Sequence, residues 1–198
     1  METQIIGVQQ WRLSGWILFP AYIVLLAALL TLCDYVSHVR LNVLWYANPT
    51  HLQWFPNQPT GDVFIGFLRM ALVCTTLGWL AFRSFPAPGV LRALLSAVVF
   101  VACYYASGVY KDYPMALYAG FMVIWVIQMI SLKQQLYKLI VFSVLLGLCG
   151  PVWEGWASSN GFFAYYDQDA YFVPLWLSAL YFNGALAVAA TLATIESW

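Results

Sequence analysis

A carboxylate inside an aromatic stretch is the feature of this sequence that could most readily do chemistry. Glu154 lies within residues 150–167, which read GPVWEGWASSNGFFAYYD and separate two strongly apolar runs. A carboxylate at the edge of an apolar run is costly to bury, so it indicates a functional site with a polar partner. The alternative is an interfacial belt, in which Trp and Tyr lie at the level of lipid head groups and Glu154 only caps a helix. The sequence is compatible with both.

A second acidic residue lies one helical turn before a histidine. Asp34 and His38 are four residues apart, so on a continuous helix they share a face and can form a hydrogen bond. Because histidine titrates near neutrality, the pair could handle a proton or clamp a lipid hydroxyl. The simpler interpretation is a helix-end pair near the interface, where a charge costs little.

Two further polar residues lie inside apolar runs. Arg69 follows Asp62 by seven residues, which returns it to nearly the same helix face. An intramembrane arginine usually faces the bundle or a wet cavity, with Asp62 or Glu154 as its partner, although it could also snorkel to the interface. Asn183 precedes Gly184 near the middle of the last apolar run, where it could bond across helices or contact a ligand.

The composition indicates the environment of these residues. The chain has 198 residues, of which 63% are hydrophobic and 8% are charged, against roughly 25% charged in an ordinary soluble domain. A soluble core of this size cannot hide such an excess, so we expect an integral membrane protein of the bacterial inner or plasma membrane, or of the endoplasmic reticulum in a eukaryote. Since the formal net charge is zero, no nucleic-acid partner is expected.

Six apolar runs are long enough to cross about 30 Å of hydrocarbon as helices. The sequence therefore predicts an all-α fold, a six-helix transmembrane bundle that forms a single domain over residues 1–198. The runs extend from about Trp16 to Cys33, Val63 to Phe82, Leu91 to Gly108, Met115 to Leu132, Leu136 to Trp156 and Tyr171 to Thr194.

Basic residues predict the orientation of the bundle. Six spans place both termini on one side of the membrane, together with two short connections. That side carries Arg12, Arg83, Arg92, Lys133 and Lys138, whereas the other carries Arg40 and Lys111. Because basic residues favour the cytoplasmic side, both termini are expected to be cytoplasmic.

Several kinds of catalytic and metal site have no signature in the sequence. It contains no HExxH, GxSxG or glycine-rich phosphate-loop pattern, and the four cysteines have no metal-ligand spacing. We therefore predict neither a metal nor a cofactor.

The layout resembles that of the insulin-induced gene (INSIG) family of sterol-regulatory membrane proteins, through bacterial relatives. The resemblance extends over roughly residues 60–195, and its best local match is NGFFAY at residues 160–165, followed by VPLW at residues 173–176. It implies a six-span, lipid-binding bundle with cytoplasmic termini. Its cavity would fit an apolar body with a small polar head.

The first functional hypothesis is a binder of a lipid or of a sterol- or isoprenoid-like molecule. Many aromatic residues and few polar groups are the usual composition of an apolar-ligand pocket. Polar residues would hold the head group and tryptophans would line the apolar part. The predicted ligand contacts are Arg69, Glu154, Asn160, His38, Trp153, Trp156, Trp176 and Asn183, with Asp34 beside His38.

The second hypothesis is a membrane-embedded cyclase or hydratase that acts on an isoprenoid or a lipid. Glu154 would donate a proton to an alkene or epoxide, Asp34 or Asp62 would act as the base, and aromatic faces would stabilise a carbocation. A structural subunit is a third alternative. A homo-oligomer or a protein partner is compatible with each of them.

Overall fold

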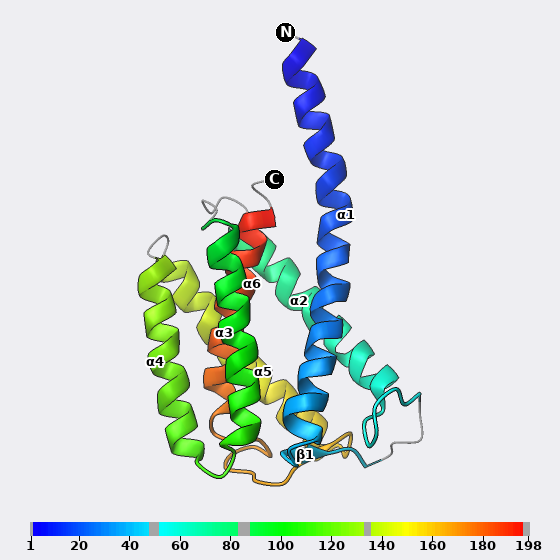
Figure 1. Cartoon of the computed structure of the whole chain (residues 1–198), viewed down its shortest axis with the longest axis vertical. Coiled ribbons are helices and arrows are strands. Elements are labelled where there is room, and N and C mark those ends of the chain that lie inside the picture. The colour runs from blue at the N-terminus through cyan, green and yellow to red at the C-terminus, as the bar shows by residue number, and fades with distance from the viewer. Residues whose placement is uncertain (1, 48–51, 83–87, 133–135, 196–198) are drawn as a thin grey trace.

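Six long helices occupy the six predicted apolar runs in the computed structural model of the chain (Figure 1). The structure describes residues 2–47, 52–82, 88–132 and 136–195. The helices are α1 (Glu2–Cys33), α2 (Thr60–Phe82), α3 (Val90–Val109), α4 (Pro114–Leu132), α5 (Leu136–Ser159) and α6 (Leu177–Ile195). Each of them includes a segment that is long and apolar enough to span a bilayer, so the chain is an integral membrane protein with six spans. The predicted all-α, six-span fold is confirmed.

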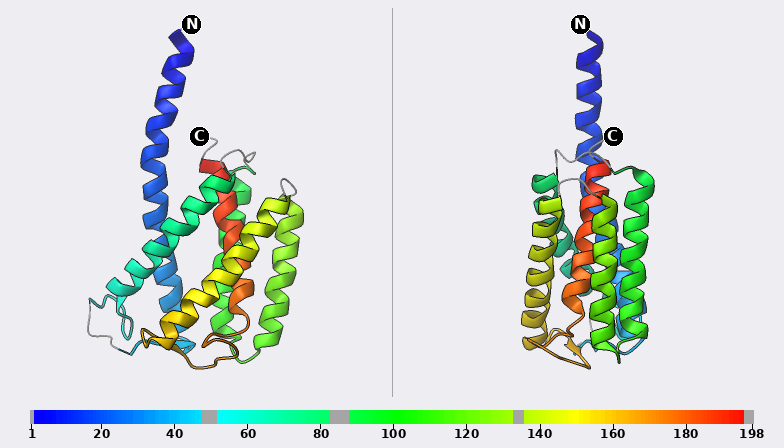
Figure 2. Two further views of the ribbon diagram at one scale, coloured as in Figure 1. Left: turned by 180° about the vertical axis from the view of Figure 1, so that it is seen from behind. Right: turned by 90° about the vertical axis from the view of Figure 1, so that its left-hand side faces the viewer.

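The last helix forms the centre of the bundle. α6 contacts all five other helices, and Figure 2 shows it between α5 on one side and α3 and α4 on the other. Within its most apolar window 67% of residues are buried, against 22% to 33% in the other spans. Small side chains such as Ala185 and Ala189, both fully buried, allow this close packing on every side.

Two of the span boundaries differ from those expected. The first span continues beyond Cys33 as a π-helix, η1 (Asp34–Val39), and the sixth begins at Leu177 and not at Tyr171. Tyr171 and Phe172 have positive φ angles, in a turn closed by a bridge between Ala170 and Val173. This turn breaks the apolar run before the helix can begin, which hydropathy alone does not detect.

The two long connections at the end of the bundle opposite the termini pair with each other. β1 (Leu44–Trp45) and β2 (Ala164–Tyr165) form an antiparallel two-stranded sheet in which Leu44 faces Tyr165. Figure 1 shows this sheet crossing one end of the bundle, whereas α1 begins and α6 ends at the other end. The structure therefore agrees with the predicted alternation of the spans. The cytoplasmic orientation stays a prediction, and two of its residues, Arg83 and Lys133, lie outside the described ranges.

The segments around the two strands have the same order of elements. In each, a long helix is followed by a short strand, a turn closed by a single bridge, and another long helix. The bridges join Phe55 to Gln58 before α2 and Ala170 to Val173 before α6. Each segment also has an acid near the end of its first helix, Asp34 or Glu154, ten residues before its strand. The two segments are therefore similar in layout and pair across the sheet.

Candidate functional site

An elongated apolar cavity runs between α1, α2, α3 and α6. Its volume is about 320 Å³, and nearly all of its surface is apolar. The lining of α3 extends from Val90 to Tyr104, which corresponds to roughly 20 Å along the helix. Glu154 from α5 lines the same cavity near Tyr104 and Tyr181. Among the described lining residues Glu154 is the one acidic side chain, so the cavity has a long apolar body and an acidic end, which is called its polar end below.

Tyrosine hydroxyls hold the Glu154 carboxylate at this polar end. Tyr181 donates to one carboxylate oxygen and Tyr165 donates to the other. Tyr181 reaches this position because α5 has a glycine, Gly150, where the two helices meet. A Cβ at that position would lie 2.6 Å from the Tyr181 ring, so a larger residue would displace the tyrosine.

A second carboxylate is buried beside this end of the cavity. Asp34 accepts hydrogen bonds on one oxygen from the Tyr46 hydroxyl at 2.9 Å and from the Gln58 amide at 2.7 Å. Its other oxygen lies 3.6 Å from Nδ1 of His38. The π-helix places Asp34 and His38 on one buried face, so the predicted pairing on a common face occurs in the interior and not at the interface.

The hydrogen bonds of His38 show which ring nitrogen carries a proton. The Ser107 hydroxyl donates to the Tyr104 carbonyl at 2.6 Å, so it must accept from Nε2–H of His38, 3.0 Å away. Nδ1 then faces a carboxylate oxygen. At 3.6 Å this is a close approach and not a hydrogen bond, so Nδ1 has no hydrogen-bond partner among the described residues.

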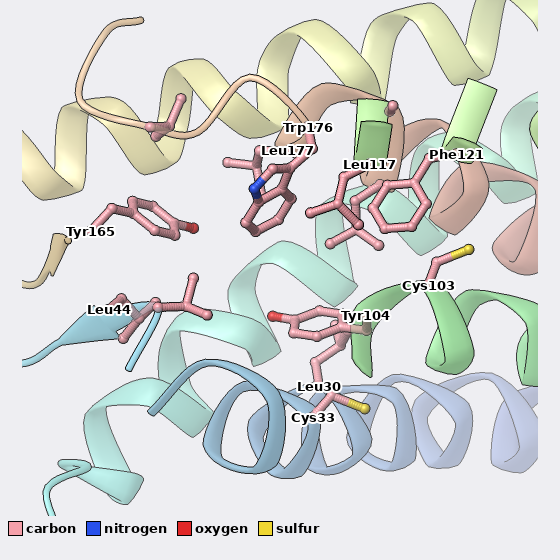
Figure 3. Close-up of a cluster of buried hydrophobic side chains, with 14 of the residues drawn as sticks. Leu30, Cys33, Leu44, Cys103, Tyr104, Leu117, Phe121, Tyr165, Trp176 and Leu177 are labelled. Atoms are coloured by element: carbon pink, nitrogen blue, oxygen red, sulfur yellow. The ribbon is translucent and has the colours of Figure 1, made fainter. Parts of the chain in front are cut away.

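Aromatic rings enclose His38 on several sides. Its ring stacks on Tyr104 with centroids 4.6 Å apart, and it lies 5.7 Å from Trp176 and 6.5 Å from Tyr165. Tyr104 presents its face to the imidazole, whereas Tyr165 approaches edge-on and Trp176 is tilted, so the histidine is enclosed in an aromatic cage beside the Asp34 carboxylate. In Figure 3 the hydroxyls of Tyr104 and Tyr165 point into the same interior space next to Trp176.

Asp34, His38 and Ser107 have the order of an acid–base–nucleophile triad, but their contacts do not suit that chemistry. Ser107 is fully buried and is not part of the cavity lining described above. Its hydroxyl proton is bonded to a main-chain carbonyl of its own helix. A nucleophile needs access to substrate and a base that accepts its proton, so we interpret this serine as a contact between α3 and η1.

The two tyrosines contributed by the strand segments are protonated at ordinary pH. Burial raises the pKa of the Tyr46 hydroxyl well above its ordinary value, and the neighbouring Asp34 carboxylate raises it further. Burial also raises the pKa of Tyr165, and Glu154 adds to this effect. Both groups therefore remain neutral hydrogen-bond donors to the carboxylates.

The structure brings four of the predicted site residues together. Glu154, Asp34, His38 and Trp176 lie at the same end of the bundle, linked by the tyrosine contacts described above. Of these, Glu154 lines the cavity, whereas Trp176 is almost fully buried and packs against His38. Trp176 therefore belongs to the cage of His38 and not to the predicted apolar lining.

The other predicted contacts lie elsewhere in the structure. Arg69 is exposed on α2, and the Glu154 oxygens predicted as its alternative partner accept from tyrosines instead. The remaining exposed candidates are Asn160, which bonds the Trp156 carbonyl, and the stacked pair Trp153 and Trp156. These three lie at or just after the C-terminal end of α5, which agrees with the alternative of an interfacial belt.

Asn183 has a packing role in the bundle. It is fully buried, accepts from the Gln128 amide at 2.8 Å and donates to the carbonyls of Phe121 and Ala179. Gln128 in turn accepts from Ser96 at 2.6 Å. These bonds join α3, α4 and α6, and they occupy the side-chain groups that a ligand would need.

Several residues that form the polar end were not predicted as site residues. They are Tyr46, Gln58, Tyr104, Ser107, Tyr165 and Tyr181. The chain contains 13 tyrosines, and a tyrosine near a span end is also typical of an interfacial belt. One signal was available: Tyr46 and Tyr165 follow Asp34 and Glu154 by twelve and eleven residues, as expected if each segment folds back on its own acid.

Comparison with known proteins bears on the fold. No protein-family model and no curated protein sequence matches the chain. Two solved structures do: a mycobacterial Insig homologue, MvINS from Mycobacterium vanbaalenii, with a TM-score of 0.73, and a cross-linked MvINS trimer, with 0.74. Each is 21% identical to this chain, and the match covers 91% of this chain and 95% of the other. The chain has the Insig fold. The predicted resemblance is therefore confirmed at the level of the fold.

Proposed function

We propose that this Insig-like protein binds a lipid or a sterol- or isoprenoid-like amphiphile in the cavity between α1, α2, α3 and α6. The observation that supports the proposal is the distribution of polar and apolar side chains along the cavity. A long apolar lining ends at one carboxylate, Glu154, which is hydrogen-bonded to two tyrosines. Ligand cavities typically combine apolar walls with a few placed polar groups. The apolar part of the ligand would occupy the length of the cavity, and its head group would lie near Glu154.

The ligand would enter from the bilayer. Leu25 on α1 and Leu94 on α3 line the cavity, yet their side chains are 68% and 58% exposed. Residues that face both the cavity and the surroundings mark an opening, which here lies between two membrane-spanning helices. A lipid could diffuse sideways through this opening without crossing water.

The contacts favour a binder over the acid-catalysed cyclase or hydratase. Both oxygens of Glu154 are hydrogen-bonded to tyrosine hydroxyls. Asp34, the predicted base, has its oxygens directed at Tyr46, Gln58 and His38. Asp34 is not among the described residues that line the cavity, so the two acids do not face one substrate together.

Native mass spectrometry of the purified protein, followed by lipid extraction, tests this function. The test variant is Ala97→Trp, because Ala97 lines the cavity and a large ring there would fill it. The matched control is the next residue, Val98→Trp, which is 63% exposed and outside the described lining. We expect a defined lipid on the wild type and on Val98→Trp, and its loss from Ala97→Trp.

Two results would contradict the proposal. One is a wild-type protein that carries no lipid and takes up none on incubation with a membrane extract. The other is equal lipid content in both tryptophan variants. An enzyme would instead convert the extracted lipid during incubation, which the same mass spectra would detect. The trimer of the homologue also supports measuring oligomeric state in these spectra.

A further inference from the structure

The acidic and basic side chains at the end of the cavity are unequal in number. The described part of this region contains two carboxylates, Asp34 and Glu154, and one imidazole, His38. His38 lies 3.6 Å from Asp34 and is stacked on Tyr104. The one basic side chain is thus placed directly beside Asp34. Among the described residues, the hydrogen bonds to Glu154 come from tyrosines and not from a basic side chain.

The cavity lining supplies no cation for Glu154 either. The described lining residues include no Lys, Arg or His, and the nearest predicted candidate, Arg69, is exposed on α2. Glu154 has only the neutral hydroxyls of Tyr165 and Tyr181 as hydrogen-bond donors. Each carboxylate oxygen can accept a further hydrogen bond, so acceptor positions remain available at the wall of the cavity.

Comparison of the two segments shows that Glu154 lacks the basic neighbour that Asp34 has. Asp34 has His38 four residues later, on the same helical face. The position four residues after Glu154 is Ser158, which carries no charge. The first segment thus contains a basic residue beside its own acid, and the second does not. Glu154 is half-buried in an apolar setting, where a bound molecule that brings a positive charge to the carboxylate would be favoured.

We propose that the cavity recognises an amphiphile whose polar head is a protonated amine, with its N–H groups donating to the Glu154 carboxylate. The rings of Tyr104, Tyr181 and Phe100 line the cavity, and aromatic rings attract an organic cation. The Phe100 and Tyr104 rings pack edge to face, 5.8 Å apart, and so form one aromatic wall. This proposal rests on the proposed binding function and specifies the head group.

The test compares three probes with the same alkyl chain: dodecylamine, dodecanol and dodecanoic acid. Binding is followed by tryptophan fluorescence of the protein in nanodiscs of phosphatidylcholine, with empty nanodiscs correcting for partition into lipid. We expect the amine to bind roughly 10- to 100-fold more tightly than the alcohol, the factor of one charge-assisted hydrogen bond. The acid should bind more weakly than the alcohol, because two carboxylates would face each other.

Variants assign the preference to Glu154. Glu154→Gln should bind the alcohol as the wild type does and lose the preference for the amine, whereas Glu154→Asp should keep it. Asp112→Asn is the matched control, since it removes an exposed acid at the same end of the bundle and outside the described lining. It should leave all three affinities unchanged.

Each failure has a distinct meaning. Equal affinity of the wild type for amine and alcohol, or an amine preference that survives in Glu154→Gln, would overturn the proposed head group while leaving the lipid-binding function intact. A wild type that binds none of the probes and carries no lipid would overturn the function itself. If Glu154→Gln bound nothing, loss of the preference in a folded Glu154→Asp would also count against the proposal.

Discussion

Replacing Gly108 by alanine should destabilise the protein and disturb the buried histidine. A Cβ at Gly108 would lie 2.0 Å from the main-chain oxygen of Ser37. That oxygen belongs to the helical backbone of η1, so the two helices would have to separate by more than about 1 Å. The neighbouring Ser107 would then lose its 3.0 Å contact with His38.

The expected change in the free energy of unfolding of Gly108→Ala is the sum of opposing effects. Overpacking costs about 1–3 kcal/mol, and the lost hydrogen bond costs about 1 kcal/mol more. Replacing a helical glycine by alanine stabilises the helix by about 0.5–1 kcal/mol, which offsets part of this loss. We therefore expect a net destabilisation of about 1–3.5 kcal/mol. The matched control is Gly120→Ala, because a Cβ at Gly120 meets nothing within 4 Å, and this variant should be neutral or slightly stabilised.

Titration with sodium dodecyl sulfate in mixed micelles, followed by circular dichroism, measures both free energies of unfolding. A Gly108→Ala variant as stable as Gly120→Ala would refute the close contact between α3 and η1. It would also count against the hydrogen bond between Ser107 and His38, which depends on the same contact.

Two further predictions concern other parts of the bundle. Asn183→Ala should cost about 1–3 kcal/mol in the same unfolding assay, because it leaves the buried Gln128 amide without an acceptor; an unchanged midpoint would contradict this packing role. The raised pKa values of Tyr46 and Tyr165 favour their neutral forms in the fold, so their contribution to stability is complete below about pH 10 and falls as pH rises above it. Thermal melts between pH 8 and 12, with phenolate absorbance recorded at each pH, should show that these two groups ionise only on unfolding. The variants Tyr46→Phe and Tyr165→Phe identify how much of the absorbance change each tyrosine contributes.

The positions of the helical spans could be predicted because they depend on hydropathy averaged over long windows of sequence. The six spans were predictable because each window averages many residues, so a few polar ones do not change the result. The beginning of the last span was misplaced because Tyr171 and Phe172 are apolar enough for a helix but adopt a turn. Glu154 was predictable as a site residue because an acidic residue in an apolar run is energetically costly and usually has a functional role.

The partners of Glu154 were harder to predict because they come from distant parts of the chain. Arg69 was the natural candidate by charge, yet the bonds come from Tyr165 and Tyr181, whose side chains give no charge signal. Gln58 reaches Asp34 from a connection that the sequence describes only as a loop. Such contacts depend on how α1, α5 and α6 meet, and residue spacing along one helix carries no information about that.

The two acids differ in what lies beside them. Both are followed by a segment that folds back and returns a tyrosine hydroxyl to the carboxylate. At Asp34 the imidazole of His38 lies beside the carboxylate and is enclosed between Tyr104 and Trp176. At Glu154 the residue in the corresponding position is a serine, and the carboxylate faces the cavity. One arrangement of helix, strand and turn therefore supports two different outcomes, an enclosed acid–histidine pair in the first segment and, in the second, a carboxylate that is open to the cavity and available for the proposed recognition.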